Sequence, residues 1–136
     1  MTLADLLTTD VTTAAPETAV ADLSRAFRGG EAVVAVLDEG RPQGLVTPAT
    51  LGRAFVDGVD LDSQSAGDLL DGDPVTIRAS ASRADLVSLL AATSERRIVV
   101  VDDDGGFAGV VAVEDVVVDF GRELEAVLDL LASRDD

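Results

Sequence analysis

The sequence contains no cysteine, histidine, lysine, tryptophan or tyrosine. Without cysteine, disulfides and thiolate metal sites are excluded. Without histidine, the commonest general base and metal ligand is missing as well. A nucleophile–base pair or a zinc site therefore cannot be assembled from the usual residues. We expect that the protein is not an enzyme, because the sequence singles out no carboxylate for acid–base catalysis.

Long apolar runs and positive charge are also scarce. No stretch is long enough to span a bilayer and no signal peptide is recognisable, so we expect a cytoplasmic protein. Ten arginines face 26 acidic residues, which gives a net charge of −16. Nucleic acids and anionic membranes both require a positive protein surface, and we therefore expect neither as a partner.

The excess of acidic residues has two interpretations. The simpler one is a hydrated surface that keeps the protein in solution. An acidic composition without lysine is also similar to that of cytosolic proteins from salt-accumulating halophiles. At about 1 M salt the Debye length falls to about 3 Å, so the mutual repulsion of the carboxylates is largely screened. We expect a halophilic source.

What the chain does have is an internal repeat and enough apolar residues, 47% of its 136, for a core. The matching segments lie 63 to 65 positions apart: Asp5-Leu6-Leu7 with Asp68-Leu69-Leu70, Ala21-Asp22-Leu23 with Ala84-Asp85-Leu86, Val34 to Asp38 with Ile98 to Asp102, and Gly44-Leu45-Val46 with Gly109-Val110-Val111. A repeat of this length predicts two copies of one supersecondary unit, stacked about a pseudo-twofold axis. The cleft between the copies is the natural place for a functional site.

Each copy is predicted to contain a lead-in, a strand, a helix, two paired strands and a second helix. In the first copy we expect these at 3–7, 11–14, 18–28, 32–37, 43–46 and 47–56, with Thr18 and Thr47 as N-caps and Leu51, Ala54 and Phe55 facing inward. In the second we expect them at 66–70, 75–77, 82–93, 98–101, 107–111 and 113–132, with Gly121 as a point where the last helix could break.

Two copies with this order resemble cystathionine-β-synthase-type (CBS) domains, and together they resemble a CBS pair, or Bateman module. The resemblance assigns residues 1–58 to the first repeat, 59–65 to a linker, 66–121 to the second repeat and 122–136 to a C-terminal helical extension. It implies an α/β (α+β) fold with two pseudo-twofold-related units, each with a small mixed sheet and flanking helices. It also implies a regulatory module that dimerises through the helices of both copies.

In nucleotide-binding members of this family, a motif at the last strand–helix junction holds the ligand. It consists of Gly, two apolar residues, Thr or Ser, two variable residues and Asp. A helix N-terminus suits phosphate, and a carboxylate suits the ribose diol. The first copy has Thr47 but carries Thr50 in place of the Asp, whereas the second has Asp115 but carries Ala112 in place of the hydroxyl. A hydrogen bond to the charged Asp contributes about 1.5–3 kcal/mol, whereas losing the hydroxyl is milder because backbone donors remain. The junction that retains Asp115 is therefore the better candidate.

The resemblance assigns six ligand-binding residues: Asp115 at the ribose, Arg97 and Thr47 at the phosphate, and Thr76, Ile77 and Val111 around the base. Most have a structural alternative that the sequence leaves open. Thr47 could act only as the N-cap before Pro48, and Asp115 could only offset the helix dipole. Arg97 could pair with one of the many acids, and Thr76 and Ile77 could be ordinary strand residues.

No metal site is expected. Counted from Asp102 or Asp103, the run Asp102-Asp103-Asp104 has no glycine at the sixth position that a calcium-binding loop requires, and we interpret it as a solvated hairpin turn.

We therefore expect a stand-alone regulatory module with no tightly bound cofactor, which binds AMP, ADP, ATP or S-adenosylmethionine and acts on a dimer or an unknown effector protein. The last helix carries an apolar stripe with no evident burial site, formed by Phe120, Leu124, Val127, Leu128 and Leu131, which predicts a homodimer. The alternative is a ligand-free dimerisation or scaffold domain with degenerate sites.

Overall fold

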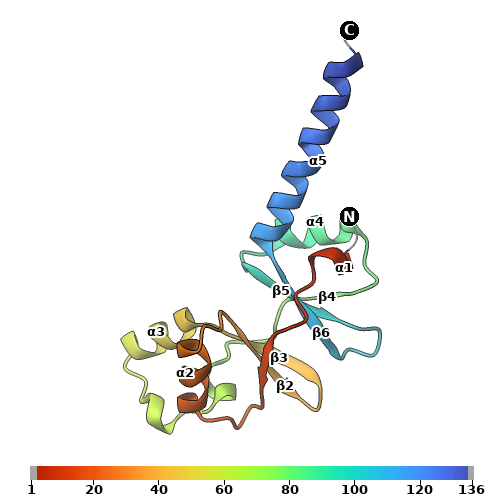
Figure 1. The fold of residues 1–136 in the computed structure, drawn as a ribbon. Coiled ribbons are helices and arrows are strands. Elements are labelled where there is room, and N and C mark those ends of the chain that lie inside the picture. Colours follow the sequence, from red (N-terminus) through yellow and green to blue (C-terminus); the bar gives the residue numbers. More distant parts are fainter. Residues whose placement is uncertain (1–2, 135–136) are drawn as a thin grey trace.

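Two small mixed sheets form the framework of the structure. The computed structural model describes residues 3–134, and its strands form two three-stranded sheets with the orders β1-β2-β3 and β4-β5-β6. In each sheet the first strand is parallel to the second, and the second is antiparallel to the third. Helices flank both sheets (Figure 1). The predicted mixed α/β fold built from a tandem repeat is confirmed.

The elements follow the same order in both copies. The first copy contains α1 (Leu3–Leu6), β1 (Thr12–Ala14), α2 (Val20–Arg28), β2 (Val34–Asp38), β3 (Arg41–Val46) and α3 (Pro48–Val56). The 3₁₀ helices η1 (Leu61–Ser63) and η2 (Ala66–Leu69) follow, and then β4 (Thr76–Arg78), α4 (Arg83–Ala92), β5 (Arg97–Val101), β6 (Phe107–Ala112) and α5 (Val113–Arg134). The expected helices and strands are present, with bounds shifted by a few residues.

The middle strand of each sheet is buried because its side chains are apolar on both faces. The segment 34–36 of β2 is 0% exposed, and the segment 98–100 of β5 is at most 1% exposed. One core lies on each sheet. The first is built around Leu23, Val34, Val36 and Val46, and the second around Leu86, Ile98, Val100 and Val111.

Three local predictions need correction. Helix α2 has Ala19, not Thr18, at its N-cap. The Thr18 hydroxyl instead accepts a hydrogen bond from Ala15 N (3.0 Å). Phe55 does not face inward, since 73% of it is exposed. Finally, α5 runs without a break through Gly121 to Arg134; a glycine there costs only about 1 kcal/mol relative to alanine.

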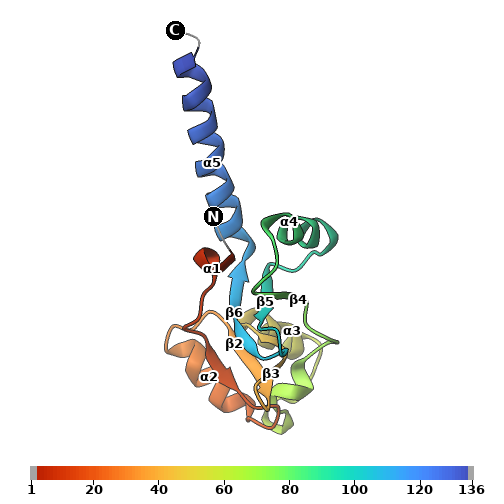
Figure 2. The ribbon, with the colours of Figure 1, turned by 90° about the vertical axis from the view of Figure 1, so that its right-hand side faces the viewer.

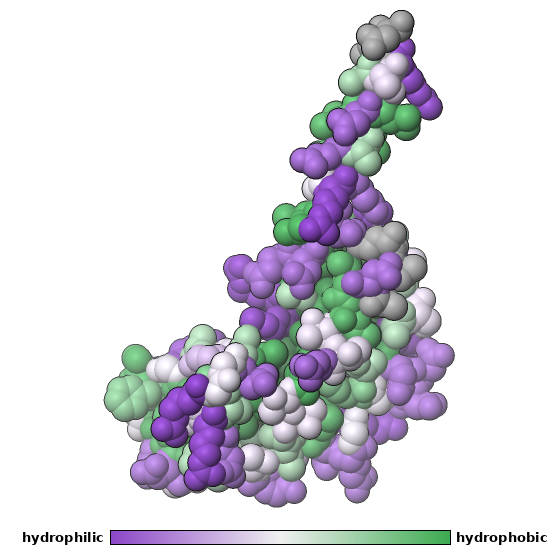
Figure 3. All heavy atoms as spheres, in the orientation of Figure 1, coloured by the Kyte–Doolittle hydropathy of each residue, from purple (hydrophilic) through white to green (hydrophobic). Residues whose placement is uncertain are grey.

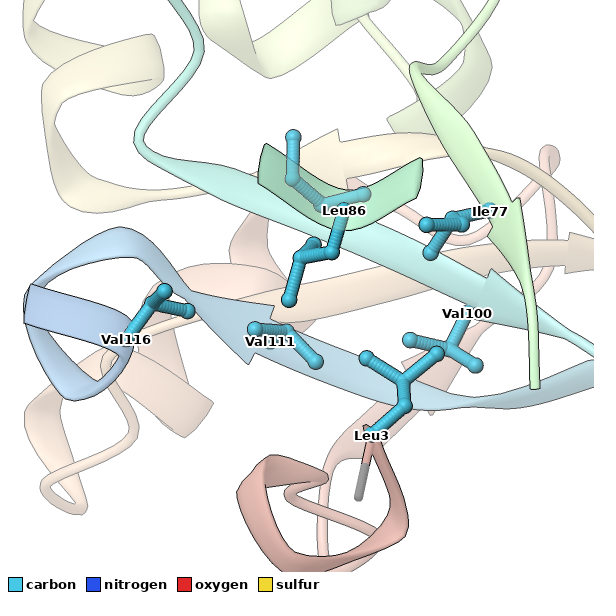
Figure 4. Close-up of a cluster of buried hydrophobic side chains, with 7 residues drawn as sticks. Leu3, Ile77, Leu86, Val100, Val111 and Val116 are labelled. Carbon is cyan, nitrogen blue, oxygen red and sulfur yellow. The ribbon is translucent and has the colours of Figure 1, made fainter. Parts of the chain in front are cut away.

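The two lead-in segments are exchanged between the copies. Leu3, at the start of the chain, is 6% exposed and packs in the core of the second copy, against residues that include Ile77 and Leu86 (Figure 4). Ala66, at the start of the second repeat, is 0% exposed and packs in the core of the first copy beside Leu23. Each copy therefore completes its core with a segment that the sequence assigns to the other.

Two glycines allow this exchange. Gly44 on β3 faces Leu70, and a Cβ atom added there would lie 2.7 Å from Leu70 Cδ2. At the equivalent Gly109 on β6, an added Cβ would lie 2.5 Å from the Thr8 carbonyl oxygen. Thr8 is held there by paired hydrogen bonds with Val110, of 2.8 and 3.0 Å. The repeated glycine of the strand–helix motif is thus explained by the crossing lead-in segments.

We expect Gly109→Ala to destabilise the protein more than Gly44→Ala. The Gly109 variant must displace backbone, and overpacking of this kind costs about 1–3 kcal/mol. The Gly44 variant meets only the end of a flexible leucine side chain. Urea unfolding of both variants measures the difference. If the two variants lose the same stability, the close packing of Gly109 against the Thr8 backbone is contradicted.

Helix α5 extends far beyond the rest of the molecule. Its C-terminal part projects from the body and ends at the C-terminus (Figures 1 and 2). Hydrophobic and hydrophilic side chains are interspersed along it (Figure 3). Leu124, Val127, Leu128 and Leu131 are each 50–59% exposed, whereas Phe120 packs against the second core. Within residues 3–134, no helix is both long enough and apolar enough to cross a membrane.

Candidate ligand-binding site

A cavity of about 700 Å³ lies between the two copies. One side is formed by the end of β3 and the first turns of α3, including Thr47 and Thr50. The other side is formed by the segment 71–75, which leads into β4, and by the segment 94–97, which leads into β5. This volume is typical of a small-molecule site. The cavity therefore lies where the repeat predicts the functional cleft.

The cavity carries charges of both signs. Its charged lining residues are Arg53, Arg96 and Arg97, together with Asp57, Asp68, Asp71, Asp73 and Glu95. Three positive and five negative charges give a net lining charge of −2. Hydrogen bonds from the backbone N–H and the hydroxyl of Ser65, each 3.0 Å long, lower the pKa of Asp68. Asp68 therefore remains ionised well below neutral pH.

Thr47 acts as the N-cap of α3. Its hydroxyl accepts a hydrogen bond from Thr50 N (3.3 Å), and the Thr50 hydroxyl accepts one from Thr47 N (3.1 Å), which completes a capping box. Pro48 has no N–H to offer. The structural role foreseen for Thr47 is therefore confirmed, and few N–H donors of this helix end remain for an anion.

Arg97 begins β5 and lines the cavity while half-buried. No ion pair involving Arg97 occurs within the described part of the chain, so the alternative that it pairs with an acid is not what the structure shows. Its neighbour Arg96 differs, since Arg96 Nη2 lies 3.5 Å from Glu114 Oε2 at the start of α5. Arg97 is therefore a half-buried cavity cation that is free to meet a ligand.

The other four predicted ligand-binding residues do not line this cavity. Asp115 lies in the first turn of α5 and is exposed, and Thr76 is exposed on β4. Ile77 and Val111 are 8% and 0% exposed in the second core (Figure 4). Alternate residues of a strand point to opposite faces, and at these positions the inward side chains fill the core. Of the six predicted residues, Thr47 and Arg97 are the two that line the cavity.

Sequence reasoning missed Arg53 and the acidic segment 71–73. Arg53 follows Thr50 by three positions and precedes Asp57 by four, so all three lie on one face of α3. All three line the cavity. The spacing from Thr50 is the signal that could have identified Arg53. No sequence spacing identifies Asp71 and Asp73 as cavity residues. Their segment lies near the first copy only because the preceding lead-in packs on that copy.

The repeat does not provide a second basic cleft. Residues 96–97 correspond, 64 positions earlier, to Ala32 and Val33. The junction that carries Asp115 and Ala112 therefore lacks the arginine pair that faces Thr47 across the cavity. The two half-motifs therefore differ in the positive charge that faces them, and the motif residues alone do not reveal this difference.

A second, apolar groove of about 440 Å³ lies between the end of α4 and the start of α5. Its apolar lining residues are Leu90, Val113, Val117 and Val118. It shares Ser94, Glu95 and Arg96 with the larger cavity, and Glu114 also lines it. The segment 94–96 therefore separates the larger cavity from the base of α5.

The acidic run at 102–104 forms the hairpin turn between β5 and β6. Asp102 Oδ1 accepts hydrogen bonds from Asp104 N (2.9 Å) and Gly106 N (2.8 Å). The carboxylate thereby fixes the turn itself. Among residues 3–134, no group of three or more acidic side chains is arranged to hold a metal ion.

Comparison with known proteins agrees with the repeated fold. The family model of the CBS domain matches residues 3–57 and 66–120. Among curated proteins, none matches the chain.

Several solved structures share the fold. An AMP-complexed CBS domain protein from Pyrobaculum aerophilum has a TM-score of 0.72 and 18% identity to this chain. The match covers 85% of this chain and 89% of the Pyrobaculum chain. The CBS-pair protein CBSX2 from Arabidopsis thaliana has a TM-score of 0.71 and 24% identity, covering 91% and 96%. The ATP-complexed cytosolic domain of the Mg²⁺ channel MgtE has a TM-score of 0.70 and 20% identity, covering 85% and 47%.

Proposed function

Because this chain belongs to the CBS domain family and carries two copies of the domain, we propose that it is a regulatory module that binds an adenine nucleotide or an adenosyl compound between the copies. CBS pairs are typically regulatory and non-catalytic, and no catalytic family is indicated. The observation that carries the proposal is the cavity of about 700 Å³ in which half-buried Arg97 has no acidic partner within the described residues.

Different lining residues would bind different groups of such a ligand. Arg97, together with Arg53 from α3, would meet the phosphate or carboxylate group through charge-assisted hydrogen bonds. Carboxylates of the segment 71–73 would accept hydrogen bonds from the ribose hydroxyls, which is the task that the family motif gives to Asp115. Two complexes of this fold, one with AMP and one with ATP, support the ligand class.

The charge of the cavity favours ligands with little negative charge. A lining of three arginines and five acids, in a chain of net charge −16, repels a triphosphate more than a monophosphate. We therefore propose S-adenosylmethionine or AMP ahead of ATP. Calorimetric titration with all three, in molar KCl to screen the overall charge, tests the proposal. Binding of none of them would contradict it.

The alternative of a ligand-free scaffold has one observation in its favour. The hydroxyls of Thr47 and Thr50 already satisfy each other's backbone N–H groups, so this helix end offers a phosphate little. In that case the cavity would be a consequence of packing, and the module would act only through assembly. The same titration separates the two functions, since a scaffold releases no heat with any adenosyl compound.

We further propose that α5 pairs with α5 of a second copy. Val117, Phe120, Leu124, Val127 and Leu131 repeat at alternating spacings of three and four, the pattern of a coiled-coil seam. Except for Phe120, these side chains are 50–63% exposed. Burying these exposed side chains against one another would contribute roughly 25 cal/mol per Å² of apolar surface. A twofold axis makes the stripe its own partner.

Charges placed on the seam are expected to dissociate this dimer. In the double variant Leu124→Glu, Val127→Glu, four carboxylates would meet across the interface, so light scattering in molar KCl should report a monomer. Ala126→Glu with Ala132→Glu adds the same charge off the seam and should leave the dimer intact. A monomeric unmodified chain would contradict the proposal.

A further inference from the structure

Arg96 takes part in both the ligand cavity and the base of α5. Arg96 lines the cavity, and its side chain forms an ion pair of 3.5 Å with Glu114. Its carbonyl oxygen accepts a hydrogen bond from Val113 N (2.9 Å), the first residue of α5. One residue thus borders the cavity and holds the start of the projecting helix through its backbone.

The ion pair between Arg96 and Glu114 is readily exchanged. The two side chains are 80% and 60% exposed, and such surface pairs contribute little because water solvates both charges. Glu114 lies in the first turn of α5, where the helix dipole stabilises a carboxylate without a cation. Separating Arg96 from Glu114 therefore leaves neither group in an unfavourable environment.

We propose that the anionic group of the bound ligand takes Arg96 away from Glu114, and that this exchange signals occupancy to α5. The inference rests on the proposed function of the cavity. Arg96 and Glu114 both line the groove at the base of α5, next to Val113 and Val117. Moving Arg96 into the cavity opens that groove at the point where the exposed stripe of α5 begins.

Thermodynamic reciprocity makes the exchange measurable from the ligand side. If ligand binding breaks the pair, the pair must oppose ligand binding by the same factor. Removing the charge of Glu114 should therefore tighten binding, and the strength of an exposed pair limits the gain to about two- to fivefold. Molar salt should abolish the gain, because it screens exposed pairs.

The test is calorimetric titration of AMP into the unmodified chain and into Glu114→Gln at about 0.15 M KCl, where exposed pairs are less screened than in molar KCl. S-adenosylmethionine serves as the probe if AMP does not bind. Glu123→Gln is the matched control: it removes the same charge from the same helix, and its ion-pair partner Arg83 does not line the cavity. We expect Glu114→Gln to bind about two- to fivefold more tightly and Glu123→Gln to stay close to the unmodified chain.

A double-variant cycle completes the test. On an Arg96→Gln background, Glu114→Gln should give no further gain, because no cation remains to be released. Equal affinities of Glu114→Gln and Glu123→Gln, or a gain that persists without Arg96, would overturn the exchange while leaving the proposed function intact. If neither AMP nor S-adenosylmethionine binds to the unmodified chain in molar KCl either, the proposed function itself is wrong.

Discussion

Replacing Arg97 by glutamine is expected to weaken the binding of S-adenosylmethionine or AMP by about 10- to 150-fold. A hydrogen bond to a charged group contributes about 1.5–3 kcal/mol, and each 1.4 kcal/mol is a factor of ten in the dissociation constant. Arg97 is half-buried and has no ion-pair partner within the described residues. Its replacement therefore leaves no acid unpaired, so the effect on binding is separable from an effect on folding. Calorimetric titration in molar KCl measures it.

The control for this variant is Arg28→Gln. Arg28 is exposed at the end of α2 and does not line the cavity, yet its replacement changes the net charge by the same amount. We expect Arg28→Gln to bind the ligand like the unmodified chain. If both variants weaken binding equally, the effect arises from overall charge, and the assignment of Arg97 is wrong.

Shortening Leu3 to alanine is expected to destabilise the second copy, although Leu3 belongs to the first repeat in sequence. Leu3 is 6% exposed in the core formed with Ile77 and Leu86. Leucine-to-alanine changes in cores cost about 2–5 kcal/mol, and we expect the lower end here because a chain end can relax. Urea unfolding gives the size of the effect. Native-state hydrogen exchange should locate it in β5 and β6 rather than in β2.

Val87→Ala provides the comparison for Leu3. Val87 lies on α4 of the second copy and is 41% exposed, so its loss should change stability by no more than about 0.5 kcal/mol. If Leu3→Ala behaves like Val87→Ala, or if the lost protection appears in β2, the lead-in segments are not exchanged as described.

The repeat made most of the fold predictable. Continuous apolar runs, such as 34–37 and 98–101, predict the buried strands. Apolar residues spaced three or four positions apart predict the helices. The exchange of lead-ins was not predictable, because a repeat defines the unit but not which copy a flanking segment packs on. Phe55 shows a related limit: helical spacing identifies an apolar face, but not whether another element covers it.

The candidate site was predicted only in part, for a physical reason. The family motif describes one strand–helix junction, whereas the cavity is formed by that junction together with segments of the other copy. Weighing the two half-motifs by the hydrogen bond that each has lost therefore favoured Asp115. In the structure, the arginines at 96 and 97 lie across the cavity from Thr47 instead. Only the packing of the two copies decides which half-motif faces positive charge.

The most direct test of the account is a crystal structure of the chain grown with saturating S-adenosylmethionine, and another grown with AMP. We predict density for one ligand per chain in the cavity between α3 and the segment 94–97, with its anionic group at Arg97. Density at the Asp115 junction, or an empty cavity in both crystals, would contradict the account.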